Sequence, residues 1–202
     1  GWGWSNSDAL LLYAWYTGLV YLTPIIGGFI ADKFMGYRRA IVLGALIMTL
    51  GHASMALEGM TSMFFYLGLT LLIIGNGLFK PNISSMVGQL YKTQGKEKDA
   101  GYTIFYMGIN LGAMIAPIVT ASWIGATWGL KWGFFAAGIG MILSTLFLEV
   151  AKKSLGHVGL PEKGKEGWSR FFAVGAGAIV LAGIVYFLLS ESTILGYLLV
   201  AI

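Results

Sequence analysis

Gly75-Asn76-Gly77-Leu78-Phe79-Lys80-Pro81-Asn82 is the stretch that decides the fold, because it places a lysine inside a long hydrophobic segment. That segment runs from about Ser62 to Leu90 and carries no charged side chain apart from Lys80. About 20 apolar residues suffice for a helix to cross a bilayer, and a lysine near its middle costs roughly 3 kcal/mol even on insertion scales. We therefore expect Lys80 to face a protein interior or a watery cavity, where another helix or a ligand is its partner.

Two structural roles compete with a ligand-facing role for this lysine. A lysine near a helix end can extend its ammonium group to the lipid headgroups. Lys80 lies ten residues before Leu90, about 15 Å along the helix, which is farther than a lysine stem reaches comfortably. A lysine that is buried only for packing is the remaining alternative, and a ligand- or ion-facing role is favoured over it.

The composition indicates an all-α polytopic membrane protein. Of the 202 residues, 57% are hydrophobic and only 11% are charged, whereas soluble domains carry about 25% charged residues. Several separate apolar runs are each long enough to span a bilayer. The chain has no cysteine, which excludes a disulfide framework and a thiol nucleophile. Its net charge of +4 comes from basic residues in loops, so membrane topology explains it and no nucleic-acid partner is indicated.

The apolar runs divide the chain into three parts. Residues 1–150 are predicted to form membrane-spanning helices, residues 151–168 a cytoplasmic connector, and residues 169–202 an accessory helix and the start of a second. The spans are expected at about 9–34, 40–56, 62–90, 100–123, 130–150 and 171–189. Three prolines fall inside these spans and are expected to act as helix hinges: Pro24, Pro81 and Pro117.

Loop charges orient the spans in the membrane. One side carries only Lys131, whereas eleven basic residues lie on the other: Lys33, Arg38, Arg39, Lys92, Lys96, Lys98, Lys152, Lys153, Lys163, Lys165 and Arg170. The basic side is therefore expected to be cytoplasmic. The N-terminus would then lie outside the cytoplasm, and without a signal peptide we expect at least one spanning helix before Gly1.

Polar residues from three spans are predicted to meet near the middle of the membrane. Lys80, Asn110 and Tyr21 each lie ten or eleven residues from the expected cytoplasmic end of their helix, or about 15–17 Å. Asn76 and Tyr106 lie one turn away on the same faces. A polar substrate with a carboxylate and peptide groups would suit this layer. Alternatively, each residue makes a separate interhelical hydrogen bond of about 0.6 kcal/mol, the reading we favour for Asn76 and Tyr106 taken alone.

Three stretches resemble the proton-dependent oligopeptide transporters, a branch of the major facilitator superfamily. Residues 27–41 resemble the first signature of that family, residues 105–114 resemble the second, and residues 75–82 are similar to its fourth helix. The likeness continues through residues 155–160. It implies a partial N-terminal helical bundle of the superfamily, with helices 2 to 6, and makes residues 171–189 the first of two extra helices found in bacterial members.

The resemblance implies a role for each candidate residue. Lys80 would hold the C-terminal carboxylate of a di- or tripeptide and take part in proton coupling, Asn110 would contact the peptide backbone or amino terminus, and Tyr21 would line the same pocket. The cytoplasmic gate motif of the superfamily would comprise Gly28, Asp32, Gly36, Arg38 and Arg39. An acid at a helix end beside arginines can lock a short loop in one state and release it in another. The implied activity is proton-coupled peptide symport across the bacterial inner membrane.

Other parts of the protein would have to complete that activity. The family's Glu-x-x-Glu-Arg motif on helix 1, its acidic residues on helices 7 and 10, and its C-terminal half have no counterpart here. The proton-binding carboxylates are therefore expected outside this segment, on the missing N-terminal helix and C-terminal half.

Three other functions can be compared with peptide symport. A related facilitator for nitrate, amino acids or drugs would share the same architecture. An intramembrane enzyme would need clustered acids or an activated nucleophile, whereas His52 and His157 have no acidic neighbour at helical spacing. No catalytic role, metal or cofactor is therefore expected. A purely structural membrane subunit would leave the cost of Lys80 unexplained.

Overall fold

The structure is a computed structural model that describes residues 5–91, 95–161 and 168–190. Within these ranges it is helical with no strand, and six helical spans are long and apolar enough to cross a membrane. The elements are α1 (Asn6–Ile30), the π-helix η1 (Ala31–Met35), α2 (Tyr37–Ala56), α3 (Ser62–Gln89), α4 (Lys96–Pro117), the π-helix η2 (Ile118–Gly125), α5 (Ala126–Trp128), α6 (Leu130–Leu155) and α7 (Trp168–Ser190). The predicted all-α polytopic class is confirmed.

Several helix boundaries differ from the predicted ones, and two of these differences affect the candidate site and the connector. α4 begins at Lys96, one turn before the expected start at Ala100, because Glu97 and Asp99 in its first turn suit the positive end of the helix dipole. α6 continues to Leu155, so the expected start of the connector at residue 151 lies inside this helix. The predicted start of a second accessory helix lies outside the described residues.

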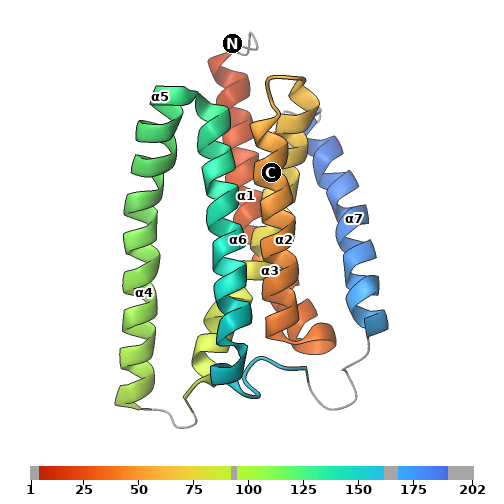
Figure 1. The fold of residues 1–202 in the computed structure, drawn as a ribbon. Coiled ribbons are helices and arrows are strands. Elements are labelled where there is room, and N and C mark those ends of the chain that lie inside the picture. The colour runs from red at the N-terminus through yellow and green to blue at the C-terminus, as the bar shows by residue number, and fades with distance from the viewer. Residues whose placement is uncertain (1–4, 92–94, 162–167, 191–202) are drawn as a thin grey trace.

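α3 is the centre of the bundle, with α1 and α2 packed against it (Figure 1). Gly75 and Gly77 permit this close packing, and each admits a different neighbouring helix. A Cβ atom on Gly75 would lie 2.7 Å from the Gly44 carbonyl oxygen of α2, and one on Gly77 would lie 2.8 Å from the Thr23 Cβ of α1. Small residues let transmembrane helices approach backbone to backbone, so Gly75 and Gly77 set the positions of both neighbours.

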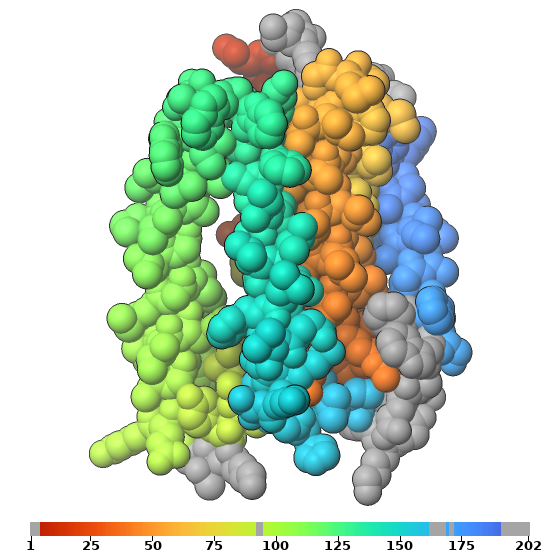
Figure 2. Space-filling view, in the orientation of Figure 1, coloured from red at the N-terminus to blue at the C-terminus, as the bar shows by residue number. Residues whose placement is uncertain are grey.

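The bundle is open on one side. α4 meets α3 near the ends that the loop charges predict to be cytoplasmic, where the Tyr102 hydroxyl donates to the Ser84 carbonyl oxygen at 3.3 Å. Farther from the cytoplasm α4 stands apart, and Figure 2 shows an opening between α4 and α6. α7 packs against the other side of the bundle, on α1 and α3. The polar residues predicted on α3 and α4 therefore lie on elements that border an open space.

Replacement of Gly27 by alanine should destabilise the protein, because its new methyl group would collide with the Gly77 carbonyl oxygen. Overpacking of this kind costs about 1–3 kcal/mol, which exceeds the gain of up to about 1 kcal/mol from replacing a helical glycine by alanine. The apparent melting temperature of the purified full-length Gly27→Ala variant should fall by several degrees. Gly18→Ala on the same helix, where a Cβ meets nothing within 4 Å, should not lower it. Equal melting temperatures for the two variants would contradict this packing.

Candidate functional site

A proline and an asparagine from different helices join α1 to α3. Pro24 lies inside α1 and has no N–H, so the Val20 carbonyl four residues earlier lacks its helical donor. The Asn76 side-chain amide of α3 donates to this Val20 oxygen at 3.1 Å. The Thr23 hydroxyl lies 3.0 Å from the carbonyl oxygen of Ile73, also on α3. Asn76, predicted as a substrate-binding residue, therefore forms an interhelical hydrogen bond in this structure.

This bond places Lys80 beside an aromatic ring. Tyr21 directly follows Val20, and the Lys80 Nζ lies 5.1 Å from the centroid of the Tyr21 ring. A cation at this distance over a phenol ring is attracted by about 0.5–1 kcal/mol at an exposed site. Among the described residues, no carboxylate forms an ion pair with Lys80. Both side chains are exposed, Tyr21 to 68%, so the ammonium group keeps its capacity to bind an anion.

The two predicted residues of α4 lie on its exposed face, at two levels. The Asn110 side-chain amide donates to the Tyr106 carbonyl oxygen of its own helix at 2.9 Å, and among the described residues no hydrogen bond joins it to Lys80. Lys80 lies nine residues before the end of α3 at Gln89, and Tyr106 lies ten residues after the start of α4 at Lys96, so both are about 14–15 Å from the cytoplasmic helix ends.

Asn110 lies one turn farther from the cytoplasm than Lys80. It is fourteen residues from the start of α4, and Asn76 is thirteen from the end of α3, or about 20 Å for both. The sequence predicts one depth for Lys80 and Asn110; the count along α4 gives Asn110 one more turn, because α4 begins earlier than predicted. The polar residues of α3 and α4 thus form two levels. Lys80 and Tyr106 lie nearer to the cytoplasmic helix ends, and Asn76 and Asn110 lie one turn farther from them.

Asn82 is a buried polar residue to which we assigned no role from sequence. It is fully buried, and its side-chain amide donates to the Gly27 carbonyl oxygen of α1 at 3.3 Å and to Leu78 at 2.6 Å. It follows Pro81, the hinge residue of α3, whose missing N–H leaves the Gly77 carbonyl without a helical donor. An amide directly after a proline in an apolar span is the sequence signal that could have revealed this role.

The predicted gate residues lie at the cytoplasmic ends of α1 and α2. Gly36 separates η1 from α2 with φ of +77°, and a Cβ atom there would lie 2.5 Å from the Pro161 nitrogen. The Asp32 carboxylate accepts from the Tyr37 hydroxyl at 3.1 Å and lies 3.9 Å from the Lys33 ammonium. A Cβ on Gly28 would make ordinary contact with Pro81, at 3.6 Å.

Arg38 contacts the segment that follows α6. Its guanidinium donates to the Gly156 carbonyl oxygen at 2.8 Å and its backbone N–H to the Gly159 carbonyl oxygen at 2.9 Å. The Gly159 N–H in turn donates to the Gln89 side chain at 2.9 Å. Arg38 is only 8% exposed, and it therefore ties α2 to the segment after α6. Arg39 is its half-buried neighbour.

The third predicted hinge also marks a change of helix geometry. Pro117 ends α4, and the chain continues as the π-helix η2. Pro24 and Pro81 instead lie within α1 and α3, where each is accompanied by an asparagine bond between the helices. The described residues hold no group of three or more acidic or histidine side chains that could bind a metal ion.

The bond between Asn76 and Val20 predicts a coupling between Asn76 and Pro24. Asn76→Ala should lower the stability of the full-length protein by about 0.6–1 kcal/mol, because the Val20 carbonyl loses its donor. In a Pro24→Ala background the new backbone N–H can bond to Val20, so Asn76→Ala should cost less. A double-mutant cycle of thermal unfolding measures this coupling. Strictly additive effects would show that Asn76 does not serve the Val20 carbonyl.

Comparison with known proteins identifies this arrangement of helices. The chain is 37% identical over 183 residues to the uncharacterized transporter YclF of Bacillus subtilis, covering 90% of this chain and 37% of that protein. It is 41% identical over 145 residues to a di-/tripeptide transporter of Lactococcus lactis, covering 71% of this chain and 29% of that protein. The chain therefore spans well under half the length of these relatives.

A solved structure shows the same fold. The structure of a bacterial homologue of the human drug peptide transporters PepT1 and PepT2 superposes with a TM-score of 0.87 and 27% identity, covering 98% of this chain and 44% of that one. The fold is thus part of the N-terminal helical bundle of a major facilitator transporter, as expected from the sequence. The sequence profile of the POT family matches residues 38–165, more than half of the chain, and the chain belongs to this family of proton-dependent oligopeptide transporters.

Proposed function

We propose that the full-length protein is a proton-coupled symporter of di- and tripeptides that works by alternating access in the bacterial inner membrane. The observation that carries the proposal is the position of Lys80. Its ammonium group lies near the middle of the membrane-spanning helix α3, over the Tyr21 ring, and is exposed toward the open side of the bundle. Among the described residues it has no carboxylate partner. The name of the Lactococcus lactis relative gives the substrate class.

The spacing of the two polar levels fits a short peptide. One helical turn separates Lys80 from the level of Asn76 and Asn110, which is about 5–6 Å. Two extended residues span about 7 Å. A dipeptide with its carboxylate on the Lys80 ammonium would therefore bring its peptide group or amino terminus to the level of Asn110. Tyr21 and Tyr106 would border the same peptide with their rings and hydroxyl groups.

The remaining parts would serve the conformational cycle. In this proposal residues 1–150 move as a bundle, residues 151–168 connect it to the rest of the protein, and residues 169–202 belong to the accessory helices. Gly28, Asp32, Gly36, Arg38 and Arg39 form the cytoplasmic gate, supported by the bonds of Arg38 to the segment after α6. The helix before residue 1 and the C-terminal half would supply the proton-binding carboxylates. No step of this cycle is an enzymatic reaction.

Removal of the Lys80 ammonium should abolish most of the transport. Loss of a charge-assisted hydrogen bond costs about 1.5–3 kcal/mol, so proton-driven uptake of labelled Ala-Ala into proteoliposomes should fall about 10- to 100-fold in full-length Lys80→Ala. Lys131→Ala is the matched control, because Lys131 also lies over an aromatic ring, at 5.9 Å from Trp132, but far from this face. Normal uptake by Lys80→Ala at equal expression would contradict the proposed role.

Competition against the same uptake tests the substrate class. Unlabelled di- and tripeptides should displace labelled Ala-Ala, whereas free alanine, nitrate and a panel of drugs that contain no peptide group should not, because they lack a carboxylate and a peptide group at the required spacing. If one of those solutes competes better than every peptide, the protein is a different facilitator of the same fold.

A further inference from the structure

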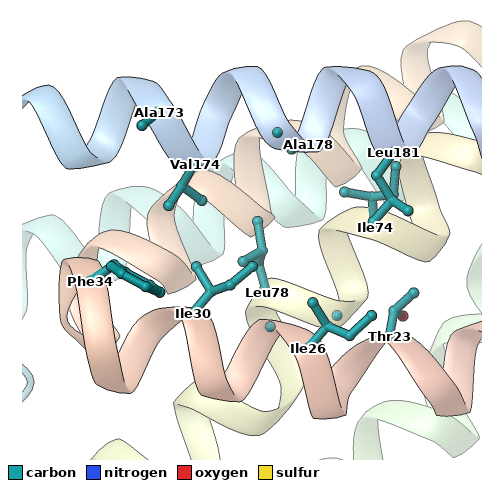
Figure 3. A pocket seen from close by; sticks show the side chains of 13 residues that line it. Thr23, Ile26, Ile30, Phe34, Ile74, Leu78, Ala173, Val174, Ala178 and Leu181 are labelled. Carbon is teal, nitrogen blue, oxygen red and sulfur yellow. The ribbon is translucent and has the colours of Figure 1, made fainter.

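An apolar groove lies between α7 and the bundle, on the side of α1 away from the Lys80 face. It has a volume of about 590 Å³, and Figure 3 shows side chains of α1 and α3 facing α7 across it. Its walls are formed chiefly by Ile26 and Ile30 of α1, Phe34 of η1, Leu78 of α3, and Ala178 and Leu181 of α7. None of the predicted substrate-binding residues lines it.

The groove exists because α7 packs closely in the bundle core near its extracellular end, whereas its cytoplasmic half contacts the bundle through Val174, which packs against Ala31, Met35 and Ala40. Near its extracellular end, Val185 and Leu189 are 3% and 2% exposed and pack in a core with Leu12 and Ile73. The cytoplasmic half of α7 instead presents small residues, and a Cβ atom on Gly177 would meet nothing within 4 Å. The side chains there do not fill the space between the helices.

The lining favours a hydrocarbon ligand. Thr23 carries the one polar side chain of the lining, and its hydroxyl lies 3.0 Å from each of two carbonyl oxygens, those of Leu19 and Ile73. No polar side chain in the lining is therefore left to bind a polar ligand. Apolar surface of this kind is stabilised by contact with another apolar group.

The length and position of the groove match one leaflet of a bilayer. From Thr23 to Phe34 it follows eleven residues of α1 and η1, or about 16 Å, close to half of the roughly 30 Å hydrocarbon core. The Phe34 end lies at the cytoplasmic side. Lys33 lies next to Phe34 in η1, with a side chain that is 57% exposed and an ammonium group 3.9 Å from the Asp32 carboxylate. A cation therefore stands where the headgroup of a lipid in the groove would emerge.

We propose that this groove binds one acyl chain of a phospholipid from the cytoplasmic leaflet, with the headgroup phosphate near Lys33. The lipid fills the space that the small residues of α7 leave and joins the accessory helix to the bundle. This site is separate from the face proposed to bind peptide.

Photolabelling of the full-length protein tests the site. The protein is reconstituted into vesicles of phosphatidylethanolamine and phosphatidylglycerol that contain a phosphatidylcholine with a diazirine on one acyl chain. After illumination, labelled positions are mapped by mass spectrometry. Label is expected on Ile30 and Ala178 in the groove, and it is normalised to label on Ile179, which is 75% exposed on the outer side of α7.

Two glycine variants decide whether the label reports the groove. Gly177→Leu should lower the normalised groove label about tenfold, since its side chain occupies the space that the acyl chain needs. Gly175→Leu should leave it unchanged, because Gly175 lies at nearly the same depth outside the groove lining and also has nothing within 4 Å of a Cβ. Equal groove labelling in both variants, or label on Ile179 with none in the groove of the unmodified protein, would overturn the proposal. The readout is independent of peptide uptake.

Discussion

The close approach of α1 and α2 to the two sides of α3 is the constraint on which the structure depends. Gly75 and Gly77 are two residues apart, so they point to different sides of α3 and admit a different neighbour each. The same approach brings Asn76 to the carbonyl that Pro24 leaves without a donor. A buried carbonyl in a membrane must find a partner within the protein, so the proline in α1 and the asparagine in α3 act as a pair.

This packing also explains why a lysine is tolerated in the middle of α3. Once Asn76 fixes Val20, the next residue, Tyr21, stands beside Lys80 and offers its ring to the ammonium group. The ring contributes less than the roughly 3 kcal/mol that the charge costs in a membrane. An anionic ligand would offset the rest of this cost, and we propose the carboxylate of a peptide as that anion.

The spans and the helices that carry the polar residues could be predicted from sequence, because they depend on hydropathy and spacing along a single helix. Contacts between helices could not. The partner of Asn76 depends on how α1 and α3 are aligned, and the level of Asn110 depends on the first turn of α4. Arg38 was expected beside Asp32 as part of a gate, yet it contacts Gly156 and Gly159, which are more than a hundred residues away. The role of Asn82 likewise requires the position of Gly27 on another helix.

The central claim is that the end of the Lys80 side chain lies in a watery cavity that a peptide occupies. Because this chain has no cysteine, a single cysteine at position 80 in a cysteine-free full-length protein can be modified with a charged, membrane-impermeant thiol reagent. The cysteine should react at a rate typical of water-exposed thiols, and attachment of an aminoethyl group, which returns an ammonium to this position, should recover part of the Ala-Ala uptake that the cysteine variant loses. Reaction only with lipid-soluble reagents, or no recovery of uptake after the aminoethyl group is attached, would contradict the account.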